Sequence, residues 1–414
     1  MSGLFKLFVS PMVTLSTKVG FAHTGTVALA AVLLLGGGVT PWALGQTYRE
    51  QVLYRFAGPT HRDGANPEGN LIRDAAGNLY GTTAVGGISN VGTVFQVTNK
   101  GKERVLHSFT NTGSDGMTPF AALVRDPKGN LYGTTFWGGS SNAGTVFTVT
   151  NKGKETVLHD FTDTGGDAYP AAGLVRDAAG NFYGTTSGGE YAYGTVFKVD
   201  ATGKETVLYS FGGSNGANPK GNLIRDAAGN LYGTTYMGGA FNNGTVFELD
   251  STGKETVLYS FAATGTGDGR NPAAGLVRDA KGNFYGTTSL GGAYDLGAVF
   301  KLDPTGKETV LHSFSSSGGD GTYPDEGLLL EANGNLYGTT YLGGAYGKGT
   351  VFKLEPTGKE TILHNFTATG GDGASPAAGL LRDAKGNLYG TTQSGGDLSC
   401  NAPSGCGIVF KLTP

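Results

Sequence analysis

The sequence predicts an all-β fold, a seven-bladed β-propeller of four-stranded antiparallel blades. Three observations predict it: a sevenfold repeat, four strand-like segments in each repeat unit, and an isolated strand at the start of the repeat region. The repeat is marked by the motif Gly-Asn-Leu-Tyr-Gly-Thr-Thr, first met at residues 77–83. Its tyrosine returns about every 50 residues, a period typical of propeller blades. The seven tyrosines are Tyr80, Tyr132, Tyr183, Tyr232, Tyr285, Tyr337 and Tyr389.

Each repeat unit contains four short segments that have the composition of strands. In the third unit they are residues 173–177, 181–186, 194–200 and 205–211. They are rich in Val, Leu, Phe, Tyr and Thr and are bounded by Gly, Asp or Asn, as strands usually are. Tight Asp/Gly turns follow the first and third segments and a Gly-Gly loop follows the second, so we expect an antiparallel meander. A solenoid is the alternative, but its coils are usually shorter than this period.

The two ends of the repeat region predict how the ring closes. Residues 51–56 (QVLYRF) match the fourth segment of a unit, whereas the last unit stops after its third segment, residues 407–412. We predict that residues 51–56 complete the last blade, which leaves the ring without a free sheet edge. The tight hairpins then lie at one end of the ring. The Gly-Gly loops, such as residues 187–193, and the inter-blade connections lie at the other, here called the loop face.

Two of the units are almost identical over a long stretch. Residues 65–83 and 217–235 differ only where Glu68 is replaced by Lys220. Such likeness implies that the two blades have equivalent surroundings, because each repeat packs only against similar neighbours.

The first 45 residues stand outside the repeat and are typical of a secretory signal. Residues 27–35 form an apolar run that is short for a membrane span, which needs about 20 apolar residues. We expect cleavage after residue 45, a single propeller domain over residues 46–414 with no membrane span, and a secreted, periplasmic or cell-surface location. An uncleaved membrane anchor is the alternative. The flanking residues that suit a signal are Lys6, Lys18, Ala43 and Gly45.

The charge balance excludes some partners. Thirty basic and 33 acidic side chains give a net charge of −3, and no basic cluster stands out. Nucleic acids and anionic membrane surfaces need such a cluster, so neither is an expected partner. We expect a monomer that engages a polysaccharide or a protein surface.

The recurring motifs together carry a resemblance to a known family. YGTT, a Gly-Gly loop, GTVFKL and TGKETVLHSF recur in this order across residues 51–412. The chain resembles the bacterial extracellular tandem-repeat family of GloVer-type, or choice-of-anchor, repeats. The resemblance implies export and residence at the surface or outside the cell, and it implies no established activity.

Histidine is the obvious candidate for catalysis or for a metal site, but its repeat position points to a structural role. Four of the six histidines share one position of the repeat with tyrosines. A position that accepts either residue uses an aromatic body with a polar tip, so we predict no metal there. The residues at this position are His107, His159, His312, His364, Tyr54, Tyr209 and Tyr259.

Two further repeated features have both a functional and a structural interpretation. An Arg-Asp pair closes the first segment, as at Arg73 and Asp74, and becomes Leu330-Glu331 in the sixth unit. It is either an anion site or an ion pair with a turn cap, and we favour the latter. One acid per connection, such as Asp63, could contribute to a calcium site. Calcium needs six to eight oxygens, so we favour a turn-ordering role and predict no cofactor.

Residues that break the repeat are the better candidates for a binding site. Aromatic rings among Gly, Ser and Asn on the loop face suit stacking on sugars or a partner surface, although each could instead pack between blades. The rings are Phe136, Trp137, Tyr169, Tyr191, Tyr193, Tyr236, Phe241, Tyr294, Tyr323, Tyr341 and Tyr346. We expect a non-enzymatic binding or scaffold protein.

The alternative is a polysaccharide-cleaving enzyme that uses unrepeated acids on the same face. A glycosidase needs two carboxyl groups about 5 to 10 Å apart across a cleft, and no pair is marked out by the sequence. The unrepeated acids are Glu190, Asp295, Asp325, Glu326 and Asp397. Of these, Glu190, Asp325 and Glu326 join the aromatic rings as candidate ligand-binding residues.

The only two cysteines, Cys400 and Cys406, lie in the lengthened Gly-Gly loop of the last unit. In an exported protein two thiols so close in one loop are expected to form a disulfide. A zinc site is the alternative, but two thiolates fill only half of one.

Overall fold

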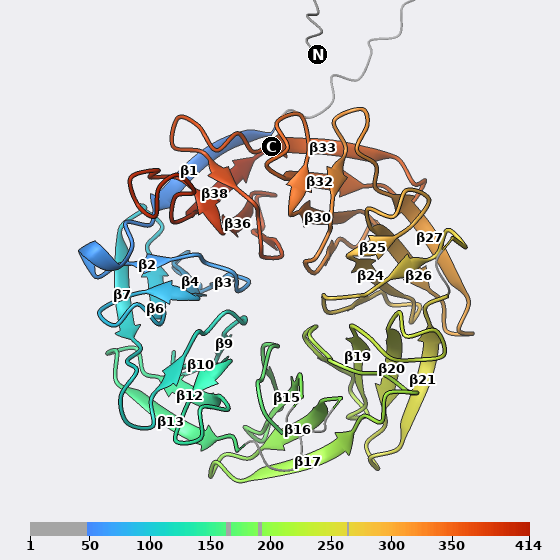
Figure 1. Ribbon diagram of the computed structural model, residues 1–414, viewed down its shortest axis with the longest axis horizontal. Coiled ribbons are helices and arrows are strands. Elements are labelled where there is room, and N and C mark those ends of the chain that lie inside the picture. The colour runs from blue at the N-terminus through green and yellow to red at the C-terminus, as the bar shows by residue number, and fades with distance from the viewer. Residues whose placement is uncertain (1–47, 163–166, 189–192, 263–264) are drawn as a thin grey trace, which may run out of the picture. The chain divides into compact units, whose positions relative to one another are not determined.

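The computed structural model describes residues 48–162, 167–188, 193–262 and 265–414. Seven four-stranded antiparallel sheets stand around a central opening, each forming one blade of a ring (Figure 1). In this part of the chain the only helix is a three-residue 3-10 turn, η1 (Pro59–His61). The predicted seven-bladed propeller is confirmed. The predicted leader, residues 1–45, lies outside the described residues.

The two inner strands of each blade come from the segments on either side of the first tight turn. The innermost strands are only two residues long, shorter than the predicted segments. They are β3 (Ile72–Arg73), β9 (Val124–Arg125), β14 (Val175–Arg176), β18 (Ile224–Arg225), β23 (Val277–Arg278), β29 (Leu329–Leu330) and β35 (Leu381–Arg382). The second strands are β4 (Leu79–Thr83), β10 (Leu131–Thr135), β15 (Phe182–Thr186), β19 (Leu231–Thr235), β24 (Phe284–Thr288), β30 (Leu336–Thr340) and β36 (Leu388–Thr392).

The two outer strands complete each blade. The third strands are β6 (Thr93–Val97), β12 (Thr145–Val149), β16 (Thr195–Val199), β20 (Thr245–Leu249), β26 (Ala298–Leu302), β32 (Thr350–Leu354) and β38 (Ile408–Thr413). The fourth strands are β7 (Glu103–Ser108), β13 (Glu155–Asp160), β17 (Glu205–Ser210), β21 (Glu255–Ser260), β27 (Glu308–Ser313), β33 (Glu360–Asn365) and, in the last blade, β1 (Arg49–Arg55).

The N-terminal strand closes the ring as predicted. β1 pairs antiparallel with β38, so the last sheet has the order β1-β38-β36-β35. Figure 1 shows the blue strand β1 beside the red strand β38 on the outer side of the last blade. Every blade therefore has the same four-stranded composition, although one of them is built from both ends of the chain.

Short ribbons place the variable loops at one end of the ring. In five blades, two residues of the inter-blade connection pair with two residues of the Gly-Gly loop. The pairing puts both kinds of loop on the loop face, as the tracing of the chain predicts. The paired segments are β2 (Gly64–Ala65) with β5 (Val85–Gly86), β8 (Gly116–Met117) with β11 (Trp137–Gly138), β22 (Gly269–Arg270) with β25 (Leu290–Gly291), β28 (Gly321–Thr322) with β31 (Leu342–Gly343), and β34 (Gly373–Ala374) with β37 (Ser394–Gly395).

Pairs of phenylalanine rings hold neighbouring blades together. Phe56, which follows β1 in the last blade, packs edge to face on Phe95 of the first blade, with ring centroids 5.0 Å apart. The same pair recurs at the other six junctions. The glycine of the YGTT motif makes room for the ring, since a Cβ on Gly81 would lie 2.7 Å from Phe95 Cζ. A fully buried phenylalanine contributes roughly 3–5 kcal/mol relative to alanine.

The repeated Arg-Asp pair has a structural role. Asp74 accepts hydrogen bonds from the Asn78 backbone N–H at 2.8 Å and from the Tyr80 hydroxyl at 2.9 Å, so it caps the inner turn. The Arg73 guanidinium lies over the ring of Tyr389 in the preceding blade, 5.8 Å from its centroid. At four of the described junctions the tyrosine of the YGTT motif thus joins the turn of its own blade to the arginine of the next.

A second set of polar contacts lies at the outer rim of each junction. Tyr54 on β1 donates a hydrogen bond to Asp63 in the connection at 2.8 Å. Asp63 also accepts the backbone N–H of Ala57 at 2.7 Å and thereby orders the connection. The carboxyl of Glu103, at the start of the next blade's fourth strand, faces the same Asp63. Tyr259, Asp268 and Glu308 repeat the arrangement.

These rim glutamates make the stability of the fold depend on pH. Burial and the nearby Asp63 raise the pKa of Glu103 to about 8, and burial and Asp268 raise the pKa of Glu308 to about 7. A folded-state pKa above the unfolded value means that the stabilisation is complete below the unfolded pKa, about 4.3, and is lost as pH rises through the folded values. We expect the free energy of unfolding to fall between about pH 5 and pH 8.

Urea unfolding at a series of pH values measures this slope. Glu103→Gln and Glu308→Gln should each flatten it, because a glutamine does not titrate. The turn aspartates titrate below this window because their pKa values are lowered. In Asp74, burial raises the pKa, but the hydrogen bonds that the carboxylate accepts lower it by more. A stability that rises from pH 5 to pH 8 would contradict the assignment.

The two cysteines form the predicted disulfide. Cys400 and Cys406 are bonded across the lengthened loop of the last blade, with Cα atoms 5.6 Å apart. Cys406 is fully buried beside Phe56 in the cluster at the ring closure. Nothing helical among the described residues has the length and apolarity that a bilayer crossing requires.

Candidate functional site

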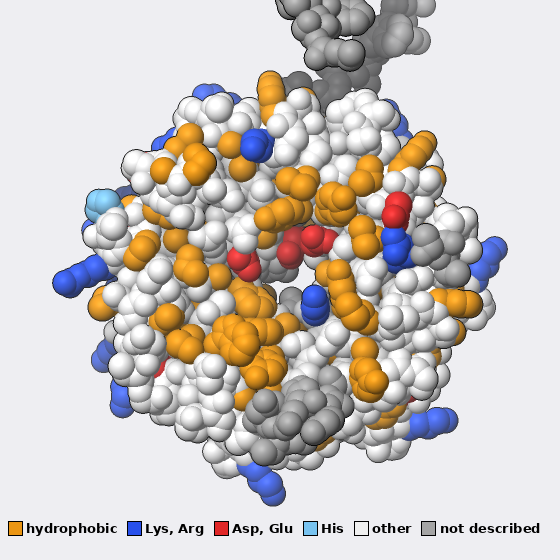
Figure 2. All heavy atoms as spheres, in the orientation of Figure 1, with side chains coloured by type: hydrophobic (Ala, Val, Ile, Leu, Met, Phe, Trp, Pro, Cys, Tyr) orange, Lys and Arg blue, Asp and Glu red, His pale blue; other side chains and the backbone are white. Residues whose placement is uncertain are grey.

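A cavity of about 780 Å³ lies at the mouth of the central channel, where the segments that lead into the innermost strands converge. All seven blades contribute to its wall. Figure 2 shows acidic and basic side chains at this central opening, with apolar side chains beside it. Cavities of about 300–1,000 Å³ are typical of small-ligand sites.

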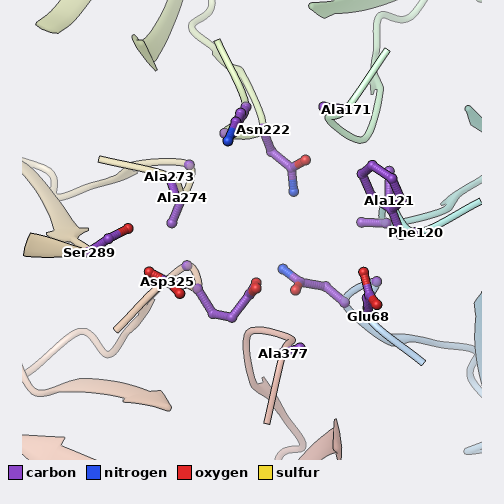
Figure 3. A pocket seen from close by; sticks show the side chains of 18 of the residues that line it. Glu68, Phe120, Ala121, Ala171, Asn222, Ala273, Ala274, Ser289, Asp325 and Ala377 are labelled. Atoms are coloured by element: carbon purple, nitrogen blue, oxygen red, sulfur yellow. The ribbon is translucent and has the colours of Figure 1, made fainter. Parts of the chain in front are cut away.

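One repeat position supplies a residue from every blade to this wall. It follows a proline in each unit, and the side chains there surround an open space (Figure 3). Three blades carry alanine, and four carry a charged or aromatic residue. In chain order the residues are Glu68, Phe120, Ala171, Lys220, Ala273, Asp325 and Ala377. The wall is therefore chemically asymmetric although the scaffold is nearly symmetric.

Three carboxyl groups lie in the cavity wall, and their surroundings disfavour ionisation. Burial raises the pKa of Glu68. It raises the pKa of Asp325 as well, although Ser289 and Lys220 oppose the effect. The pKa of Glu326 is raised furthest, by burial and by the charges of Asp325 and Glu68. Asp325 Oδ1 is buried and has no hydrogen-bond partner in the part of the chain that the structure describes.

Hydrogen bonds and a ring contact position the other polar groups of the wall. Gln393 donates to Glu68 at 2.7 Å and accepts from the Tyr341 hydroxyl at 2.7 Å, which links three side chains of two adjoining junctions. The Lys220 amine lies 3.9 Å from the ring centroid of Tyr236. Its pKa is lowered by burial, which the charge of Asp325 partly offsets.

Two asparagines complete the polar wall. The Asn222 side-chain oxygen accepts the backbone N–H of Gly173 at 2.6 Å, and Asn70 accepts that of Gly379 at 2.6 Å. Because these oxygens are engaged by the backbone of the neighbouring blade, each side chain has its amide NH₂ to offer to a ligand.

An aromatic cluster adjoins the cavity on the second and third blades. Phe120 in the wall packs on Phe136, with centroids 5.2 Å apart. Phe136 in turn contacts Trp137 at 5.0 Å and Tyr169 at 5.5 Å. Trp137 remains 39% exposed. Since no other blade carries this set of rings, the cluster marks one sector of the channel mouth.

The structure brings five of the candidate binding residues together and places the others elsewhere. Those that line the cavity are Tyr236, Tyr323, Tyr341, Asp325 and Glu326. Trp137 adjoins it through the aromatic cluster. Those that are exposed and do not line it are Tyr193, Phe241, Tyr294 and Tyr346. Glu190 and Tyr191 lie outside the described residues.

The sequence reasoning missed several residues of the wall. In the sequence Glu68 and Lys220 stand out only as the single mismatch between two similar units, yet both face the channel. The signal was there: one position of the repeat varies among acid, base, aromatic ring and alanine while its neighbours hardly change. Ser289 and Gln393 carried the same kind of signal, because the position directly after YGTT also varies from unit to unit. Tyr236 and Tyr341 occupy this position in their own blades and line the cavity as well.

Comparison with known families and structures agrees with the fold. The sequence model of one protein family, described as the Gloeobacter/Verrucomicrobia repeat, matches residues 36–189, 101–278, 167–329 and 227–414. No curated protein sequence matches the chain significantly.

The similar solved structures are distant. One, described as the extracellular domain of a hybrid two-component system of B. thetaiotaomicron, has a TM-score of 0.53 and 14% identity, covering 89% of this chain and 42% of that one. The chain thus spans about two fifths of that protein's length. A protein described as a 6-phosphogluconolactonase from Bacteroides uniformis has a TM-score of 0.47 and 16% identity, covering 76% and 88% of the two chains. At these identities the likeness shows the fold alone.

Proposed function

The chain belongs to the Gloeobacter/Verrucomicrobia repeat family, and we propose that it is an exported binding protein whose channel mouth takes up part of a carbohydrate. The ligand class is a neutral or amino sugar. The wall holds one lysine and three carboxyl groups, so a polymer of uronic acids would find a single cationic partner and would be repelled by any wall carboxyl that is ionised.

The observation that carries the proposal is the asymmetry of one wall position. Residues 65–83 and 217–235 differ only in Glu68 and Lys220, and both of these side chains line the cavity. Alanine at the same position in three other blades indicates that packing does not require a large or charged side chain there. Recognition of an asymmetric ligand accounts for residues that the fold does not need.

The chemistry of the wall suits a sugar. Carboxyl and amide groups can bond to hydroxyl groups, and the exposed face of Trp137 can stack on the C–H face of a pyranose ring. The apolar cluster and the acids lie on different blades around one opening, so a single sugar unit could contact both. A protein surface is the second kind of ligand that the loop face would suit.

Export and the monomeric state are part of the same proposal. The apolar leader segment, the disulfide between Cys400 and Cys406, and a structural neighbour that is an extracellular domain support residence outside the cytoplasm. Closure pairs β1 with β38, so the edge of β38 is not open to pairing with another copy, which supports a monomer.

A glycan array followed by calorimetry tests the proposal. We expect the purified protein to bind neutral or amino oligosaccharides and not uronate polymers, and to release no product from them. Binding only to proteins, or to no glycan at all, would contradict it. Salt should weaken binding only slightly, because few charges are involved.

A polysaccharide-cleaving activity is the second candidate, and the adjacent acids favour it. Burial and the charges of Asp325 and Glu68 raise the pKa of Glu326, which is the direction that an acid catalyst of glycoside cleavage requires. If the protein cleaves its ligand, new reducing ends should appear. Glu326→Gln should then abolish their release and leave binding in place.

A further inference from the structure

Three junctions at the outer rim bring a histidine, an aspartate and a glutamate together. Each set joins a fourth strand, the connection that follows it, and the fourth strand of the next blade. Among the described residues the ligand atoms of three sets lie within 4.8 Å of one another. These sets, here called rim triads, are His107 with Asp115 and Glu155, His312 with Asp320 and Glu360, and His364 with Asp372 and Glu50.

The separations within the rim triads fit a shared ion. His312 Nε2 lies 3.3 Å from Asp320 Oδ2 and 3.9 Å from Glu360 Oε2. In the other two triads, His107 Nε2 is 3.7 Å from Asp115 Oδ1 and His364 Nε2 is 3.5 Å from Asp372 Oδ1. Two ligands of a tetrahedral zinc ion, each bound at about 2.0–2.2 Å, stand roughly 3.4 Å apart. Small side-chain movements would therefore bring all three groups onto one ion.

Unpaired atoms provide a second, independent observation. His107 Nε2, Asp115 Oδ1 and Glu155 Oε1 are all buried, and none has a hydrogen-bond partner among the described residues. The same is true of His364 Nε2. A buried polar atom without a hydrogen bond costs about 1–3 kcal/mol, and the 3.7 Å between His107 Nε2 and Asp115 Oδ1 is too long for one. A coordinated cation would satisfy all of them at once.

We propose that the three rim triads bind divalent transition-metal ions of the zinc class, which tie each blade to the next. One imidazole nitrogen and two carboxylate oxygens suit zinc, with water in the fourth position. Calcium, which takes six to eight oxygen ligands, does not suit this set. Glu50 belongs to β1, so the third ion would fasten the closing strand to the sixth blade.

The repeat itself supplies the controls. Tyr54 and Tyr259 stand where the rim triads have histidine, and each hydrogen-bonds to the aspartate of its connection at 2.8 Å and 2.7 Å. The change His→Tyr therefore puts into a triad the residue that other blades already accommodate. His159 occupies the same repeat position and lies 3.4 Å from Glu205, and Asp167 interacts with both. Among the described residues, however, the ligand atoms of these three side chains do not all lie within 4.8 Å of one another.

Zinc content of the purified, tag-free protein tests the proposal. After chelation and dialysis against zinc chloride, elemental analysis should give about three ions per chain. His107→Tyr, His312→Tyr and His364→Tyr should each lose one ion, whereas His159→Tyr should lose none. Tyr259→His, which meets Asp268 and Glu308, should gain one.

Thermal melts in chelator separate metal loss from misfolding. The variants should melt like the parent protein without zinc, and zinc should raise the melting temperature of the parent more than that of each His→Tyr variant. A protein that retains no zinc, or whose zinc content does not change in the three His→Tyr variants, would overturn the proposal. In that case the carboxyl groups of the rim triads are neutralised by protonation and not by a metal ion.

Discussion

Deleting residues 48–57 should prevent the ring from closing and lower the free energy of unfolding by more than about 5 kcal/mol. The deletion removes β1, its ladder with β38, and the fully buried Phe56. Loss of one buried phenylalanine costs roughly 3–5 kcal/mol by itself, and the deletion also exposes the edge of β38 to pairing with other chains. Thermal and urea unfolding followed by circular dichroism measures the loss.

A single substitution makes the same test quantitative. Phe56 packs on Phe95 across the closure, and Phe261 packs on Phe300 within the continuous part of the ring, with centroids 5.0 and 5.1 Å apart. Phe56→Ala should therefore cost as much as Phe261→Ala. If Phe56→Ala were nearly neutral while Phe261→Ala were costly, the N-terminal strand would not be part of the closed ring.

Alanine at the asymmetric wall position should remove binding and leave the fold intact. Phe120→Ala and Asp325→Ala should each weaken binding of the glycan identified by the array at least tenfold, or about 1.4 kcal/mol. Phe120 anchors the aromatic cluster, and Asp325 offers an acceptor that has no partner in the protein. Melting temperatures should hardly change, because alanine occupies this position in three other blades.

The exposed rings away from the cavity provide the matched control. Tyr294→Ala and Tyr346→Ala remove rings that are 63% and 62% exposed and do not line the cavity. Their affinities, measured by calorimetry, should equal that of the parent protein. Weaker binding in these variants, together with normal binding in Phe120→Ala, would move the site to the outer loops.

The fold could be predicted from the sequence because each strand and turn recurs in seven repeat units, so each inference could be checked in all of them. Strand order, closure by residues 51–56 and the loop face all follow from the recurring turns. The innermost strands were predicted too long because their first residues leave the blade. Ala172 and Gly173 of the third blade bond to its neighbours instead. The Thr134 hydroxyl of the second blade donates to Ala172 O at 3.0 Å, and the Gly173 N–H donates to the Asn222 side chain of the fourth blade.

The site was less predictable because a sequence reveals the face of a propeller but not the distance from its axis. Tyr236 directly follows the second strand of its blade and lines the channel wall, whereas Tyr294 lies further along, beyond β25 in the Gly-Gly loop, and does not line the cavity. Asp325 and Glu326 were found because no other unit has two adjacent acids there. The rim triads were missed for another reason. The exchange of His for Tyr argued against a metal, while the convergence of aspartate and glutamate from two blades is visible only in three dimensions.

A crystal structure of the protein with its bound oligosaccharide would test the central claim most directly. The account predicts a sugar ring at the channel mouth, stacked on the cluster of Phe120, Phe136 and Trp137, with hydroxyl groups directed to Asp325 or Glu68. A sugar bound instead on the outer loops near Tyr294 or Tyr346, with the channel mouth free of it, would contradict the account.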